Sequence, residues 1–130
     1  MNNQNPIEIY QAQDGTTQVE VRFEKDTVWL SQAQMANVFD TSSDNISLHL
    51  RNIFNESELD ENLTSEDFSV VQQEGQREVQ RTLKFYHLDA IISVGYRINS
   101  QKATRFRQWA TQVLNEYIRK GFVMDDERLK

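Results

Sequence analysis

Apolar and polar residues alternate between positions 19 and 23, and a turn and a second apolar run follow, which predicts a β-hairpin near the start of the chain. Val19, Val21 and Phe23 would face one side of an extended strand whose intervening residues are polar. Residues 24–26 favour a turn, and residues 27–30 are the predicted returning strand. Residues 1–14 are rich in side-chain amides, so we expect a loosely ordered N-terminal segment.

Helical spacing replaces this alternation over residues 31–54. Ser31 and Gln34 have the spacing of a capping box, which predicts the start of a first helix. Residues 40–43 are turn and cap formers that would separate it from a second helix. The apolar stripe of that second helix is Ile46, Leu50, Ile53 and Phe54. Two short helices joined by a tight turn predict a helix-turn-helix, although Asp40 stands where glycine is common. The alternative is two core helices without a role in nucleic-acid binding.

A second hairpin is predicted after this unit. Residues 68–73 and 78–87 have strand character, and they flank a turn at Glu74-Gly75-Gln76. A hairpin that follows a helix-turn-helix stands where a winged-helix domain carries its wing. The alternative is an ordinary hairpin whose charged side chains are simply solvated.

Two helices are predicted to complete the domain. Residues 88–96 indicate a short, largely buried helix, and Asn99 or Ser100 would cap a long last helix that ends at Gly121. The pattern as a whole predicts an α+β fold, a single winged-helix-like domain over residues 15–124. Residues 125–130 would be a C-terminal tail.

The last helix carries an aromatic stripe that is either core or a seam between two copies of the chain. A homodimer would suit recognition of DNA, because two half-sites are normally bound by a two-fold symmetric pair. The candidate seam residues are Phe106, Trp109, Val113 and Tyr117.

Length and composition narrow the class of protein. A chain of 130 residues suggests one domain, and the absence of cysteine excludes disulfides and thiolate metal sites. No apolar run is long enough to span a membrane, and the N-terminus lacks the basic and apolar regions of a secretory signal. We therefore expect a soluble cytoplasmic protein.

The net charge of −6 is unevenly distributed. Residues 1–68 hold 13 acids and 3 bases, whereas residues 69–124 hold 4 acids and 9 bases. A polyanion should therefore meet the second half of the chain. The acidic segment 56–67 is expected to be a loop or short helix that serves as a solvated connector.

Motifs of catalysis are missing from the sequence. We find no zinc-binding histidine motif, no phosphate-binding glycine loop and no nucleophile elbow. His49 and His87 are far apart, and His87 precedes a predicted buried helix, which favours a structural role. We expect no enzymatic activity, no metal site and no cofactor.

Three segments carry a resemblance to a known family: NIFNESELDEN (52–62), FYHLDAIISVGYRINSQKATRFRQWATQVLNEYIRKGF (85–122) and DDERLK (125–130). They closely resemble the N-terminal region of the RhuM family of bacterial proteins, which is named for a pathogenicity-island protein and often described as virulence-associated. The pattern FRQWATQVL…IRKGF is also similar to the end of Bro-N modules of phage antirepressors, which are thought to bind DNA. The resemblance implies a regulator of mobile-element or phage origin, and a longer protein that continues beyond residue 130.

The leading hypothesis is a DNA-binding regulatory domain whose recognition helix spans about residues 43–54. Asn45 would pair with adenine, and Arg51 with guanine or phosphate, whereas Asp44 would repel phosphate. The candidate contacts to double-stranded DNA are Ser42, Ser43, Asn45, Ser47, His49 and Arg51, with Arg77, Arg81 and Lys84 from the wing and Arg105 from the last helix.

The alternative hypothesis is a protein-interaction module of antirepressor type that binds another regulator rather than DNA. Its basis is the net negative charge, the acidic segment 56–67 and the aromatic stripe, because acidic surface steers towards basic partners. The two hypotheses differ in where they need the basic residues of the second half. DNA binding requires them beside the predicted recognition helix.

Overall fold

The computed structural model describes residues 7–12, 15 and 17–129, the last ten of them by their backbone alone. The fold is α+β, as the sequence predicts. The elements in chain order are β1 (Ile7–Gln11), β2 (Gln18–Glu24), β3 (Thr27–Ser31), α1 (Gln32–Phe39), α2 (Ser43–Asn55), α3 (Glu61–Thr64), β4 (Ser65–Glu74), β5 (Arg77–His87), α4 (Leu88–Ile98) and α5 (Ser100–Leu129).

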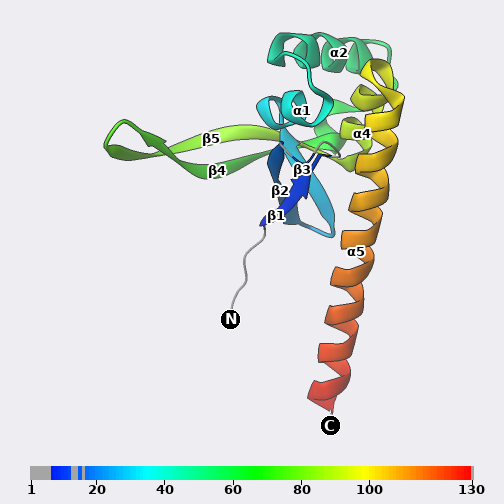
Figure 1. Ribbon diagram of the computed structural model, residues 1–130. Coiled ribbons are helices and arrows are strands. Elements are labelled where there is room, and N and C mark those ends of the chain that lie inside the picture. Colours follow the sequence, from blue (N-terminus) through cyan, green and yellow to red (C-terminus); the bar gives the residue numbers. More distant parts are fainter. Residues whose placement is uncertain (1–6, 13–14, 16, 130) are drawn as a thin grey trace.

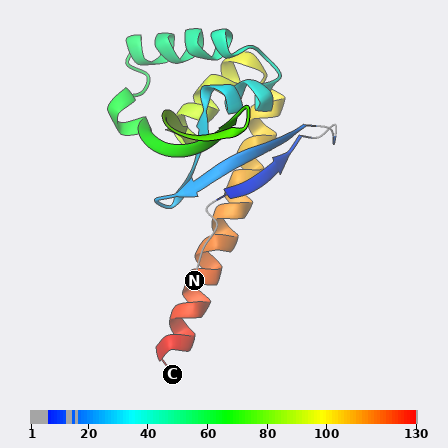
Figure 2. The ribbon, with the colours of Figure 1, turned by 90° about the vertical axis from the view of Figure 1, so that its left-hand side faces the viewer.

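The strands form one antiparallel sheet in the order β1-β2-β3-β5-β4. Because β3 pairs with β5, the helices α1, α2 and α3 are inserted between two neighbouring strands. The hairpin β4–β5 projects to one side of the body, while α5 descends along the opposite side (Figure 1). Figure 2 looks towards the hairpin and shows α2 crossing above it.

The main core lies between one face of the sheet and the helices. Each strand contributes alternate residues, as the pleat requires, and each helix contributes one stripe. Burial of these side chains is the main favourable term for folding. The most deeply buried large side chains are Phe39, Phe106, Leu30, Met35, Ile46, Ile53, Ile91, Val21, Val28 and Val94.

The predicted capping signals around α1 and α2 are confirmed. The Ser31 amide donates to Gln34 Oε1 at 2.9 Å, and the Gln34 amide donates to Ser31 Oγ at 3.3 Å. Asp40 takes the left-handed conformation that ends α1, with φ of 56°. Ser42 is the N-cap of α2, because its Oγ accepts from the Asn45 amide at 3.0 Å.

The second hairpin is longer than predicted, with strands of 10 and 11 residues. A second apolar cluster of Trp29, Phe68 and Phe85 anchors its base on the other face of the sheet. Beyond the Val70–Arg81 pair, the residues from 71 to 80 are exposed except for half-buried Val79. The outer half of the hairpin therefore stands in solvent.

The prediction of a loosely ordered segment over residues 1–14 is wrong for residues 7–11, which form the edge strand β1. Tyr10 faces inward and is 7% exposed, because its ring packs against two aromatic residues of α5. Backbone pairing with β2 completes the strand. The amide-rich composition gave no sign of this strand, because only one of its side chains, that of Tyr10, is buried. The rest of the segment, apart from Ala12, lies outside the described residues.

The predicted end of the last helix at Gly121 is also wrong. The backbone of α5 continues through Gly121 to Leu129, so the predicted tail 125–130 is helical as far as Leu129. Glycine costs a helix about 1 kcal/mol relative to alanine but keeps its amide donor. No proline follows to enforce a stop. The acidic segment contains the short helix that was one of its two predicted forms, α3, and the start of β4 follows it.

Candidate nucleic-acid interface

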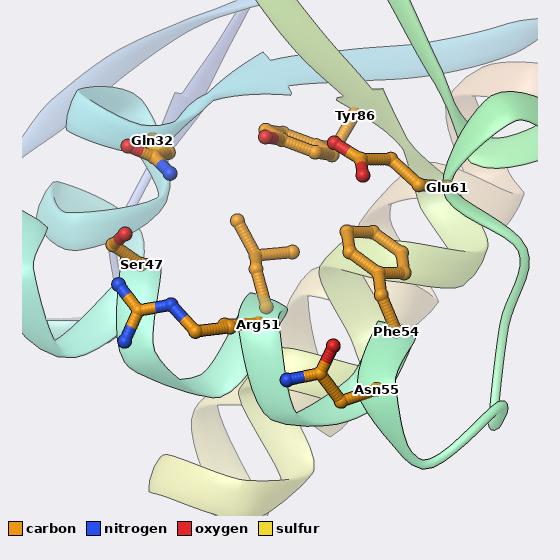
Figure 3. A pocket seen from close by; sticks show the side chains of 8 residues that line it. Gln32, Ser47, Arg51, Phe54, Asn55, Glu61 and Tyr86 are labelled. Carbon is orange, nitrogen blue, oxygen red and sulfur yellow. The ribbon is translucent and has the colours of Figure 1, made fainter.

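A cleft opens where α2 faces α3 and the base of β5. Its inner part has a volume of about 220 Å³. Figure 3 shows Arg51, Ser47 and Gln32 on one side and Glu61 and Phe54 on the other. Asn55 and Tyr86 complete its rim, and Leu50 also lines it. The cleft is thus lined by both polar and apolar side chains.

A second part of about 400 Å³ continues the cleft towards the hairpin. Gln32 and Tyr86 line both parts, so the two adjoin. The remaining lining residues come from the start of α1, the start of α2 and the base of the hairpin. They are Ser31, Ala33, Ser43, Gln72, Leu83 and Lys84.

The side of α2 that faces the cleft is a row at four-residue intervals. Ser43, Ser47, Arg51 and Asn55 follow one another along it, as residues four apart on a helix share a face. The buried stripe of α2 holds this row in position from behind. Arg51 is exposed and has no ion pair among the described residues. Its charge is therefore available to a ligand.

Two of the three predicted hairpin cations are held by carboxylates. Lys84 Nζ lies 3.1 Å from Glu61 Oε2, and this hydrogen bond raises the pKa of Lys84. Arg81 donates from Nε and Nη2 to the two carboxylate oxygens of Glu74, at 2.8 and 2.9 Å, which raises the pKa of Arg81. Arg77 is exposed and has no ion pair within the described part of the chain.

Four of the ten predicted DNA contacts therefore meet in this cleft: Ser43, Ser47, Arg51 and Lys84. Arg77 and Arg81 lie on the outer hairpin that borders it. Sequence reasoning missed several further lining residues, four of them polar or aromatic residues of the first part of the cleft. Asn55 continues the row of α2 and could have been found by extending it, whereas the others come together only through the fold. Those others are Gln32, Glu61 and Tyr86.

Three candidates on or next to α2 lie outside the cleft, and two of them have local structural roles. Ser42 caps the helix, and Asn45 Nδ2 donates to Thr41 Oγ1 at 3.0 Å. His49 is half-buried, and its Nδ1 is buried without a hydrogen-bond partner among the described residues. None of the three lines the cleft.

Arg105 lies away from the cleft, beside β1. Burial raises the pKa of Tyr10, and the positive charge of Arg105 opposes that rise, which places Arg105 near the edge strand. Arg107 likewise interacts with Tyr96 of α4. Neither Arg105 nor Arg107 lines the cleft beside α2. Figure 1 shows α5 leading away from the hairpin.

The predicted oligomer seam contributes to the core of the single chain. Phe106 is fully buried, and the Tyr10 ring centroid lies 5.0 Å from those of both Phe106 and Trp109. Val113 packs against the same core. Tyr117 contacts Phe23 at 4.6 Å between ring centroids but remains 56% exposed. The stripe is therefore core, and a homodimer stays a prediction.

His87 has a structural role at the junction of β5 and α4. Its Nδ1 accepts from the Asp89 amide at 3.2 Å, and its Nε2 lies 3.0 Å from the Leu63 carbonyl oxygen. Both contacts are satisfied by the tautomer that carries hydrogen on Nε2.

Among the described helices, none is long and apolar enough to cross a membrane.

The fold and the cleft define the class: an α+β domain in which a helix pair and a long hairpin frame a polar cleft. Residues 63–130, more than half of the chain, match the virulence protein RhuM family, and the chain belongs to that family. The family match confirms the resemblance to the RhuM family found in the sequence. It includes the hairpin, α4 and α5, whereas α1 and α2 precede it. No curated protein and no solved structure matches the chain.

Proposed function

We propose that this chain is a winged-helix-like DNA-binding domain of a regulatory protein, with α2 as recognition helix and the β4–β5 hairpin as wing. One observation carries the proposal: side chains from α1, α2 and β5 converge on a single cleft. An exposed Arg51, which has no ion pair among the described residues, lines this cleft. The α2 row has the residue types of base recognition, since hydroxyl, guanidinium and amide groups all bond to base edges in the major groove.

The hairpin would contribute contacts to the DNA backbone. Arg77 lies at the hairpin tip, where phosphate contacts set the position of a protein on the duplex without reading its sequence. The first turn of α2 adds Ser43 and the amides of a helix N-terminus, which favour anions. Asp44 stands on the same turn and opposes phosphate binding. We therefore expect modest, salt-sensitive affinity that depends on few cations.

The test is fluorescence anisotropy with a pool of random duplexes at low salt. We expect Arg51→Ala to weaken binding about tenfold, since a bidentate arginine–base contact is worth about 1–3 kcal/mol. Arg77→Ala should weaken it less and reduce the salt dependence. Arg107→Ala is the matched control, because it removes the same charge from α5, away from the cleft.

Two results would contradict the proposal. One is unchanged binding by the triple variant Arg51→Ala, Arg77→Ala, Arg81→Ala. The other is an equal loss in Arg107→Ala, which would mean that any positive charge serves and that the cleft is not the site.

A second candidate function is capture of another regulatory protein, as antirepressors do. The observation that favours it is a set of exposed apolar side chains on the elements that frame the cleft. Leu48 of α2, Leu63 of α3 and Val71 of β4 are 45%, 76% and 64% exposed. Such side chains suit a protein partner better than a phosphate backbone.

This second function predicts a different pattern of sensitivity. A protein retrieved from host lysate by the wild-type chain should be lost with Leu48→Asp and retained with Arg51→Ala. Retention by Leu48→Asp would exclude α2 as the contact. Loss with both variants would indicate one shared surface for both functions.

A further inference from the structure

We infer that Glu61 and Glu74 are specificity determinants of the proposed DNA site, because each holds a hairpin cation that a phosphate would otherwise bind. This inference rests on the proposed function. It assigns a role to two carboxylates that look unfavourable for DNA binding. In the free protein they would act as intramolecular competitors of the DNA backbone.

The two ion pairs differ in geometry but share their exposure. Glu61 reaches Lys84 from α3, across 23 residues of sequence, and lines the cleft itself. Glu74 holds Arg81 through two contacts, the planar arrangement that orients a guanidinium. The four side chains are between 42% and 51% exposed. A phosphate can therefore reach both cations without any rearrangement of the fold.

Exposed ion pairs contribute little to stability, so a phosphate can displace either carboxylate. The displaced carboxylate nevertheless stays beside the incoming phosphate and repels it. Arg51 and Arg77 carry no such competitor among the described residues. Non-specific duplex, which depends on the number of phosphates neutralised, would thus find few free cations. Only duplex that also satisfies the α2 row would be bound well.

The experiment compares isosteric variants that differ only in whether a cation is released. Glu61→Gln and Glu74→Gln each remove one negative charge and free one cation. Glu78→Gln is the matched control: it lies on the same hairpin and is exposed, with no ion pair in the described part of the chain. Binding of a labelled random-sequence duplex is measured by anisotropy at several NaCl concentrations.

We expect Glu61→Gln and Glu74→Gln each to tighten binding and to steepen the salt dependence. One additional phosphate contact changes the slope of log K against log salt by about −0.9, so a fourfold rise in salt weakens such a variant about 3.5-fold more than wild type. Glu78→Gln should leave the slope unchanged. Adding Lys84→Gln to Glu61→Gln should abolish the gain, since Lys84 is then no longer available.

The outcomes separate this inference from the proposed function. Equal slopes for all three glutamine variants, with binding still weakened by Arg51→Ala, would overturn the inference and leave the DNA-binding proposal standing. A gain that persists in the Glu61→Gln, Lys84→Gln variant would overturn the role of Glu61. Absence of Arg51-dependent binding in wild type and every variant would overturn both. Thermal unfolding of each variant checks that the fold is intact.

Discussion

The two ends of the sheet are built from different kinds of side chain. At the β1–β2 end, α5 lays aromatic rings against the strands, and Tyr10, Phe106 and Trp109 meet at about 5.0–5.5 Å between centroids. At the β4–β5 end, the hairpin runs beyond every helix and carries mostly exposed polar side chains. The first end buries apolar surface, whereas the second arranges charges around a cleft.

This difference separates stability from recognition. Burial of aromatic and aliphatic groups stabilises the fold in proportion to the area removed from water. Exposed charges contribute little, so they can be exchanged without unfolding the chain. Helices α1 and α2 join the two regions, since one side of each faces the core and the other faces the cleft. Substitutions in each region should therefore change different measurements.

The largest effect is expected at the aromatic end. Phe106→Ala should lower the free energy of unfolding by about 3–5 kcal/mol, because it leaves a cavity beneath Tyr10. Urea denaturation measures the loss. Gln108→Ala, on the exposed side of the same helix, should stay within about 0.5 kcal/mol. A cost below 1 kcal/mol for Phe106→Ala would mean that α5 is dispensable for the fold.

A smaller loss is expected where α4 passes close to α1 and α5. A Cβ at position 95 would lie 2.6 Å from Phe39 Cζ and 2.8 Å from Ala103 Cβ. Gly95→Ala should therefore cost about 1–2 kcal/mol by overpacking, despite the better helix propensity of alanine. Phe39→Leu should make room, so the double variant should cost less than the sum of the two single ones. Simple additivity would count against this contact.

The helix that joins the two regions depends on its N-cap. Ser42→Ala should lower the free energy of unfolding by about 1 kcal/mol, because the Asn45 amide loses its acceptor. Ser43→Ala is the control one residue later, where the side chain faces the cleft. Equal urea midpoints for the two variants would show that the cap contributes nothing.

Shortening the hairpin tests the polar end directly. Replacing residues 71–80 by Asn-Gly would join Val70 to Arg81 through a two-residue turn that suits a hairpin. We expect the free energy of unfolding to change by less than about 1 kcal/mol, because the removed side chains are largely exposed. DNA binding should change little, since the loss of Arg77 is offset by the release of Arg81 from Glu74. Loss of the fold would show that the two ends are not independent.

The smallest effect concerns the link between the acidic segment and α4. Arg97 donates to Glu56 and Glu58 at 2.9 and 2.8 Å, and its hydrogen bond lowers the pKa of Glu58 from its ordinary value of 4.5. A carboxyl group whose pKa is lower in the folded state stabilises the fold at any pH above its unfolded-state pKa. This contribution to stability is lost as the pH falls through the folded-state pKa. Arg97→Gln should therefore flatten the decline in stability below about pH 4.5, measured by urea titrations. An unchanged profile would show that the Arg97–Glu58 pair does not contribute to the decline in stability at low pH.

Local chemistry explains which features could be predicted from the sequence. The capping box of Ser31 and Gln34 and the left-handed Asp40 depend on neighbours within a few residues, and the structure confirms them. The strand β2 was predicted from the alternation of its apolar and polar residues, and β3 from its place after the turn at residues 24–26. The cleft side of α2 was predicted in part because helical spacing assigns Ser43, Ser47 and Arg51 to one side once the apolar stripe is known.

Features that depend on distant partners could not be predicted. β1 becomes a strand only because Tyr10 finds the rings of α5. Charges counted along the chain suggested that the basic side chains of the hairpin were free to bind DNA. In the fold, Glu61 and Glu74 neutralise Lys84 and Arg81. A sum of charges along a sequence does not reveal which charges are paired.

The pairing of β3 with β5 has a consequence for how such domains diversify. Leu30 opposes Tyr86 across this ladder, so everything between them is an insertion bounded by two neighbouring strands. The entropy lost on closing a loop rises only slowly with its length. Its exposed parts, the outer hairpin and the cleft side of α2, can therefore change at little entropic cost, provided that the buried stripes of α1 and α2 are kept. Relatives that share this core could then recognise unrelated targets.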